Sequence, residues 1–165
     1  MVSGEGVRDL HTRQGFSDAA AAMARLLFTV SFSILHDQEL CADAVQNALL
    51  KAWRSRRSLR DPEKFNGWLV KIVMNESKTL LRRPATLPLR EEIPAGQFGH
   101  EVKLDVANAV LGLDERYRIP IALFYFEDMP VSEIAALLDL PKGTVISRLS
   151  RAREKLRKEL KDYDV

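Results

Sequence analysis

The segment from Pro84 to His100 most limits what this chain can fold into. It reads PATLPLREEIPAGQFGH and carries prolines at 84, 88 and 94 and glycines at 96 and 99. Proline cannot donate a backbone hydrogen bond, and glycine weakens helices and strands, so regular structure is not expected there. The 165-residue chain is therefore predicted to fold as two units joined by a linker.

On both sides of this linker the apolar residues recur at helical spacing. Residues 16–35, 38–54 and 63–83 are each expected to form one helix, the last with a core face of Phe65, Trp68, Leu69, Ile72, Val73, Leu80 and Leu81. No alternating pattern runs long enough to build a sheet. The predicted fold class is all-α, with two small helical domains.

The second unit has the spacing of a helix-turn-helix. The buried side of a short helix is predicted to hold Val131, Ile134, Ala135 and Leu138, and that of the next helix Val145, Leu149, Ala152 and Leu156. A compact turn is expected around Asp139 and Leu140. Pro130 and Pro141 each lie near a helix start, where proline does no harm.

Basic residues are concentrated in two blocks. Residues 142–161 hold eight basic and two acidic side chains, and residues 51–83 hold ten basic and three acidic, although the whole chain has a net charge of only +2. Such clustering is typical of contacts with a polyanion such as a nucleic acid. A solvated helix face remains the alternative reading for either block alone.

Lys71, Asn75, Lys78 and Arg82 follow the progression i, i+4, i+7, i+11 and are predicted to form one stripe away from the apolar face. Asparagine offers both a donor and an acceptor to a base edge, whereas lysine and arginine pair with phosphates and with guanine. The stripe can therefore contact DNA, or it can be an ordinary solvent face.

In a helix-turn-helix the second helix enters the major groove with its N-terminal part against base edges. On this basis the side chains suited to bases are Ser147, Ser150 and Arg151. Those suited to phosphates or to local salt bridges are Thr144, Arg148, Arg153 and Lys155.

Several function classes are not expected. Cys41 is the single cysteine, and the three histidines lie far apart without a repeated ligand spacing, so neither a metal site, a cofactor nor a catalytic group is indicated. No apolar run is long enough to span a bilayer, and the N-terminus lacks an apolar signal core, which predicts a cytoplasmic protein without membrane insertion. A small-molecule substrate is not expected either.

Three stretches in order resemble the extracytoplasmic-function (group IV) bacterial sigma factors. They are DAVQNALLKAW, then FNGWLVKIVMNESKTLLRR, then LDERYRIPIALFYFEDMPVSEIAALLDLPKGTVISRLSRAREKL. The resemblance runs from about Phe16 to Leu160. It implies a sigma domain 2 at residues 10–84, a linker at 85–103 and a sigma domain 4 at 104–161.

The resemblance implies that the protein acts in transcription initiation at genes of stress or envelope responses. The partners it implies are core RNA polymerase, promoter DNA and an anti-sigma factor. Domain 4 would hold the minus-35 element, and domain 2 would read and melt the minus-ten element, with Asn75 at the head of the melting helix. The loop that captures an unstacked base would be residues 54–64, which include Arg56, Arg57 and Arg60.

The same resemblance places polymerase docking on one helix. The residues carried over are Asp43, Gln46, Asn47, Leu50 and Trp53. Trp53 could equally be part of the core.

Three positions depart from the family pattern. Ile146 replaces a residue that is commonly basic, so an apolar contact with a thymine methyl could replace a polar one. Thr79 stands where many members carry an acidic or amide residue, and Pro120 is expected to start or kink a helix.

Two other readings stay open. A helix-turn-helix regulator would usually bind a palindrome as a symmetric dimer, which fits two dissimilar basic units poorly. A helical adaptor would explain the apolar pattern but not the paired basic blocks.

Overall fold

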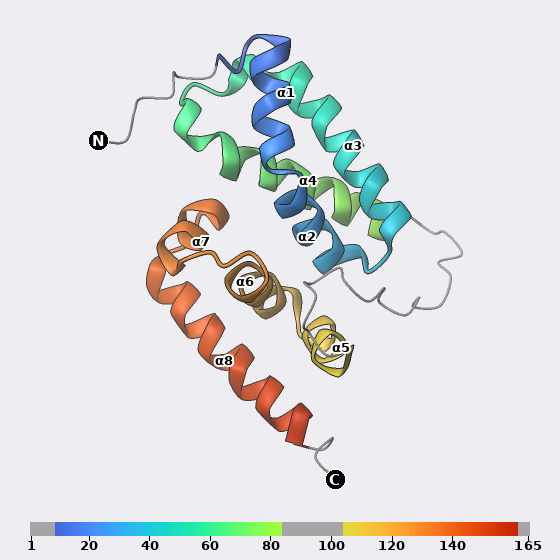
Figure 1. Cartoon of the computed structure of the whole chain (residues 1–165), viewed down its shortest axis with the longest axis vertical. Coiled ribbons are helices and arrows are strands. Elements are labelled where there is room, and N and C mark those ends of the chain that lie inside the picture. The colour runs from blue at the N-terminus through green and yellow to red at the C-terminus, as the bar shows by residue number, and fades with distance from the viewer. Residues whose placement is uncertain (1–8, 84–103, 162–165) are drawn as a thin grey trace.

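The computed structural model describes residues 9–83 and 104–161, and within these residues it contains helices and no β-strand (Figure 1). The elements are α1 (Arg13–Ala22), α2 (Ala24–Leu35), α3 (Gln38–Ser55), η1 (Arg56–Ser58), η2 (Pro62–Lys64), α4 (Phe65–Leu81), α5 (Leu104–Gly112), α6 (Glu115–Tyr125), α7 (Val131–Leu138) and α8 (Lys142–Lys161). The all-α prediction is confirmed. The predicted linker, residues 85–103, lies outside the described residues.

The first unit is built around three mutually packed helices, α2, α3 and α4. The side of α3 that faces the core is made of small residues, Cys41, Ala44, Ala48 and Ala52, all fully buried. Small side chains let the neighbouring helices come close. The Asp37 side chain caps α3 by accepting a hydrogen bond of 2.8 Å from the Leu40 amide.

The prediction of one helix over residues 16–35 is wrong, because the chain turns at Met23. The Met23 amide bonds the carbonyl of Ala20, three residues back, which ends α1, and α2 starts at an angle of 59°. The bend allows both helices to bury side chains, Phe16 from α1 and Leu27 from α2, while Met23 itself is buried at the corner. No proline or glycine marks this break in the sequence.

The predicted core face of α4 is confirmed for most of its members and wrong for one. Phe65, Leu69 and Val73 are buried, but Leu81 is exposed at the last residue of the helix. Glu76 and Ser77 are buried instead.

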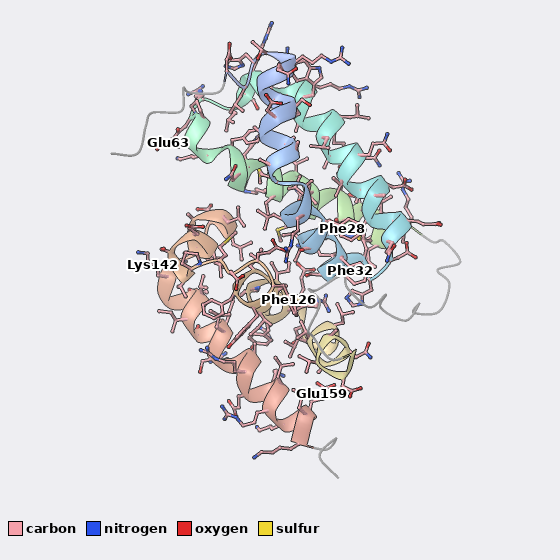
Figure 2. All side chains as sticks on the ribbon, in the orientation of Figure 1. Phe28, Phe32, Glu63, Phe126, Lys142 and Glu159 are labelled. Atoms are coloured by element: carbon pink, nitrogen blue, oxygen red, sulfur yellow. The ribbon has the colours of Figure 1, made fainter. Side chains whose placement is uncertain are left out.

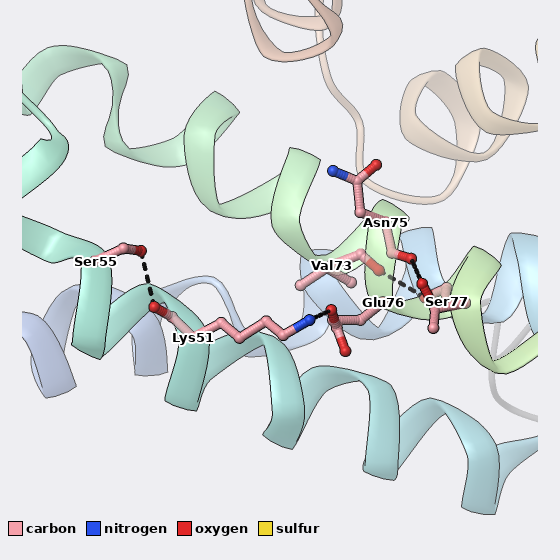
Figure 3. Close-up of polar contacts among 7 residues, drawn as sticks. Lys51, Ser55, Val73, Asn75, Glu76 and Ser77 are labelled. Atoms are coloured by element: carbon pink, nitrogen blue, oxygen red, sulfur yellow. Dashed lines mark hydrogen bonds and ion pairs between the residues drawn. The ribbon is translucent and has the colours of Figure 1, made fainter.

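These two polar residues are buried with partners. The Ser77 hydroxyl lies 2.9 Å from that of Ser31 on α2, and the Glu76 carboxylate pairs with the Lys51 ammonium on α3 (Figure 3). A buried polar group is tolerated when it is hydrogen-bonded. The α2–α3–α4 core therefore contains polar links that an apolar periodicity does not predict.

The second unit contains the predicted helix-turn-helix in α7 and α8. Ile134, Val145 and Leu149 are among its most buried side chains. Asp139 closes α7 in the left-handed conformation, with φ of 54°, and so forms the tight turn. Pro120 lies inside α6 rather than at a helix start, because α6 begins five residues earlier, at Glu115.

The two units pack against each other, α2 on α6 and α4 on α7 (Figure 1). At the first contact the Thr29 hydroxyl donates to the Glu127 carboxylate at 2.6 Å, and Arg25 donates to the carbonyl of Phe126 at 2.7 Å. Phe126 is the C-cap residue of α6 and is labelled in Figure 2. At the second contact Gly67 lets α4 approach closely, since a Cβ there would lie 3.2 Å from the Leu137 carbonyl oxygen.

No single helix of the described residues is long and apolar enough to cross a membrane. The bent pair α1 and α2 passes the test of length and composition when both helices are taken together. Most residues of α2 are buried in the bundle. A buried core helix of a globular domain passes the same test of length and composition.

Candidate nucleic-acid and polymerase interfaces

The predicted stripe on α4 is present, and its members differ in what they contact. Lys71, Asn75 and Arg82 are exposed. Asn75 points away from α3, on the side of α4 opposite to Glu76 (Figure 3). Lys78 is half-buried, and its ammonium lies 2.8 Å from the Glu115 carboxylate of α6. Three members of the stripe therefore face solvent, and the fourth joins the two units.

The arginines after α3 also differ in what they contact. The Arg56 guanidinium lies 3.6 Å from the centre of the Trp53 ring and donates to the carbonyls of Trp53, at 2.7 Å, and His11, at 3.1 Å. Cation–π contact and two hydrogen bonds hold this side chain against the protein. Arg57 and Arg60 are exposed beside it. Arg56 therefore supports the loop, while the other two present charge to solvent.

The predicted polymerase-docking residues form one face of α3. Asp43, Gln46, Asn47 and Leu50 are all exposed, and their spacing of three and four residues places them in one row. Trp53 is half-buried and packs edge-on against Phe16, with ring centres 5.3 Å apart. Trp53 therefore belongs partly to the core, the alternative that the sequence left open.

A groove of about 560 Å³ lies between α1, α2 and α3. Its lining is mainly apolar and consists of Arg13, Phe16, Ser17, Ala20, Ala21, Ala24, Leu27, Val45, Leu49 and Trp53. Sequence reasoning missed it, because it depends on the turn at Met23 and on the distance between helices. Val45 and Leu49 line the groove next to the predicted docking row, and only their helical spacing in the sequence could have indicated this.

Helix α8 presents most of its predicted DNA-contacting residues. Ser147, Ser150, Arg151, Arg153 and Lys155 are exposed. Thr144 and Arg148 are half-buried at the edge of the core side. The basic block is therefore a surface, and residues that pack against α6 and α7 lie on the opposite side of the helix (Figure 1).

Two of these cations lean back onto the second unit. Arg153 donates to the Tyr125 hydroxyl at 3.5 Å, and the Lys155 ammonium lies 5.7 Å from the centre of the Tyr117 ring. Both contacts are long and weak. These two side chains are thus oriented toward α6.

Further basic residues of α8 were not singled out from the sequence. Lys142 and Arg157 are exposed, and Lys158 pairs with Glu154 one turn earlier at 3.1 Å. The bond and the charge of Lys158 lower the pKa of Glu154. Glu154 therefore stays ionised and offsets part of the positive charge in the second half of the helix.

Comparison with known protein families assigns both units. A family model described as Sigma-70 region 2 matches residues 20–86, and one described as Sigma-70, region 4 matches residues 103–156. The ECF RNA polymerase sigma-E factor of Escherichia coli is 33% identical over 133 residues, which cover 68% of this chain and 69% of that protein. This chain belongs to the extracytoplasmic-function (ECF) sigma factors.

Other relatives of this ECF sigma factor agree. The sigma factor SigV of Bacillus subtilis is 29% identical, with 84% of this chain and 86% of that protein covered. Among solved structures, the sigma factor RpoE of Bartonella quintana, in complex with the anti-sigma factor NepR, matches with a TM-score of 0.71 at 25% identity. That match covers 90% of this chain and 98% of the other.

A second solved structure, CnrH in complex with the cytosolic domain of CnrY, matches with a TM-score of 0.68 at 28% identity over 93% of this chain and 92% of the other. The family resemblance drawn from the sequence is confirmed. As an RNA polymerase sigma factor, the protein acts in transcription initiation: it directs core polymerase to promoters and promotes their opening.

Proposed function

We propose that the two units of this ECF sigma factor divide promoter recognition between them. Residues 10–84 bind core polymerase and read and melt the minus-ten element, residues 104–161 hold the minus-35 element, and residues 85–103 link them. The observation that carries this proposal is that two exposed basic surfaces lie on two separate helices, α4 and α8. Two dissimilar surfaces suit two dissimilar DNA elements better than the two halves of a palindrome.

At the minus-35 element, α8 enters the major groove. Ser147, Ser150 and Arg151 meet base edges, because they are exposed in its N-terminal half. The phosphate contacts fall to Thr144, Arg148, Arg153 and Lys155. The assignment is supported by the exposure of Ser147, Ser150, Arg151, Arg153 and Lys155. Thr144 and Arg148 are half-buried and support it less.

At the minus-ten element, Asn75 reads a base while Lys71 and Arg82 hold phosphates. Lys78 joins them only when its pair with Glu115 breaks. Arg57 and Arg60 hold the displaced strand beside them, and Arg56 fixes the loop through Trp53. Melting costs a few kcal/mol of stacking and pairing, which the captured bases and the cationic contacts offset.

Polymerase docking falls to the exposed row on α3, Asp43, Gln46, Asn47 and Leu50, with Trp53 supporting it from the side. The neighbouring apolar groove adds area to this face. Apolar area surrounded by polar side chains is the usual composition of a protein–protein interface.

The same homology supports broader assignments. Because two similar sigma factors were solved with NepR and with CnrY, this protein is expected to have an anti-sigma partner of its own. Its place of action is the cytoplasm, and its target genes serve stress or envelope responses. Its role is binding rather than catalysis.

Two template types separate the proposed roles. We expect Arg151→Ala to weaken binding of the holoenzyme to a duplex with the minus-35 element, and to leave binding to a minus-ten single strand unchanged. Asn75→Ala should weaken binding to the minus-ten single strand and leave binding to the minus-35 duplex unchanged. Loss on both templates with either variant would contradict the division, and absence of any holoenzyme would favour a dimeric DNA-binding regulator instead.

A further inference from the structure

The exposed face of α8 contains one large apolar side chain. Ile146 is 55% exposed, directly after the fully buried Val145. Of the four large apolar side chains exposed in the described residues, Leu50 lies on the proposed polymerase face, Leu81 ends α4, and Tyr125 contacts Arg153. Ile146 instead lies among residues proposed to enter the major groove.

Exposure of one isoleucine is common on protein surfaces and carries no conclusion by itself. The surroundings of Ile146 add to it. Gly143, one turn earlier, has no atom within 4 Å of where a Cβ would be, so the described chain leaves that side of the helix open. Lys142 and Ser150, four residues before and after Ile146, are exposed as well. The apolar side chain is thus placed between a cation and a hydroxyl on an uncovered face.

The positive charge of α8 indicates which kind of partner this face binds. The eight basic and two acidic side chains of residues 142–161 favour a polyanion over an apolar protein surface. The apolar group that the major groove of DNA exposes is the C5 methyl of thymine. Ile146 has no polar atom that could bond a base edge, but its branched side chain can bury that methyl.

We infer that Ile146 is a specificity-determining residue that selects thymine at one position of the minus-35 element through its methyl group. This inference rests on the proposed minus-35 role of α8. Ser147 and Ser150 then supply the polar contacts to neighbouring bases. Burying one methyl corresponds to about a four-fold preference, or about 0.8 kcal/mol.

Deoxyuridine tests the methyl alone, because it pairs like thymine and differs only by that group. The full-length protein is assembled with core polymerase, and its minus-35 element is defined by selection from a randomised promoter library. Each thymine of the selected element is then replaced by deoxyuridine, and the affinity of the holoenzyme is measured by competition. Thermal unfolding of each variant checks that the exposed substitution leaves the fold intact.

At one position the parent protein should lose about four-fold in affinity on the uridine template. Ile146→Ala should bind the thymine template about four-fold more weakly than the parent does and the uridine template as tightly as the parent does, so that it no longer distinguishes the two. Ile146→Val should keep most of the preference. Ser147→Ala serves as the matched control, since loss of a hydroxyl should weaken both templates by the same factor.

The inference is overturned if the parent shows no loss with uridine at any position, or if Ile146→Ala retains the loss. A parent holoenzyme without any dependence on the minus-35 element would refute the role of α8 itself, and this result is distinct from the others.

Discussion

The ammonium of Lys78 lies 2.8 Å from the carboxylate of Glu115, and this ion pair joins α4 of the first unit to α6 of the second. Both side chains are about one-third exposed, at 35% and 36%. Water therefore screens the attraction. A residue proposed to hold the minus-ten strand is thus occupied by an acidic side chain whenever the two units pack in this way.

This contact predicts a measurable coupling between the units. In a double-mutant cycle with Lys78→Gln and Glu115→Gln, the free energy of unfolding in urea should give a coupling of about 0.5 kcal/mol. The coupling should shrink when the ionic strength rises from about 0.05 M to about 1 M, because salt screens exposed pairs. Strict additivity at low salt would show that the two residues do not meet in solution.

The contact between Thr29 and Glu127, which also joins the units, predicts a larger effect because it is better buried. The Glu127 side chain is 11% exposed and accepts a 2.6 Å bond from the buried Thr29. Thr29→Val keeps the shape but removes the donor, and it should lower the free energy of unfolding by about 1–3 kcal/mol.

The matched control for this variant is Thr79→Val on the exposed side of α4, whose hydroxyl bonds only within its own helix in the structure. Its effect should stay within about 0.5 kcal/mol. Equal losses in the two variants would mean that the Thr29–Glu127 bond does not contribute.

Neighbouring arginines should separate folding from promoter binding. Arg56 is held by Trp53 and by two backbone carbonyls, so Arg56→Ala should lower the free energy of unfolding by about 1–2 kcal/mol. Arg57 is exposed, so Arg57→Ala should change stability by less than about 0.5 kcal/mol while reducing affinity for the minus-ten strand. A loss of stability in Arg57→Ala but not in Arg56→Ala would exclude a structural role for Arg56.

Cys41 predicts a dependence on alkaline pH. Burial raises the pKa of its thiol from 9.0 to about 11, although a hydrogen bond from Ser31 partly opposes the shift. The unfolded chain loses this proton first, so stability from this group is fully present below pH 9 and is lost as the pH rises from 9 to about 11.

The free energy of unfolding should therefore fall less steeply in this range for Cys41→Ala than for the parent. The difference in slope should be at most about 1.4 kcal/mol per pH unit. The native thiol should also react slowly with a disulfide reagent at neutral pH. Parallel slopes, or rapid labelling of the folded protein, would contradict the burial of this thiol.

Much of the fold could be predicted because local spacing determines it. The period of Phe65, Leu69 and Val73 indicated the core side of α4, and the spacing of Val145 and Leu149 indicated that of α8. The break at Met23 could not be predicted in this way, because it comes from packing rather than from a proline or glycine.

The candidate site was predictable to a similar extent. Exposure of Asn75 and Arg151 follows from their place opposite the apolar face. The partner of Lys78 did not follow, since Glu115 is distant in sequence and only the packing of two units brings them together. The cation–π contact between Arg56 and Trp53 depends on the turn after α3, where helical spacing no longer applies.

The central claim is that this protein directs core polymerase to promoters. Run-off transcription tests it most directly, with core polymerase free of any sigma factor and a library of promoter fragments, with and without this protein. We expect transcripts that appear only with the protein and depend on both promoter elements. Absence of such transcripts, with a core polymerase shown to be active and no inhibitor copurified, would contradict the account.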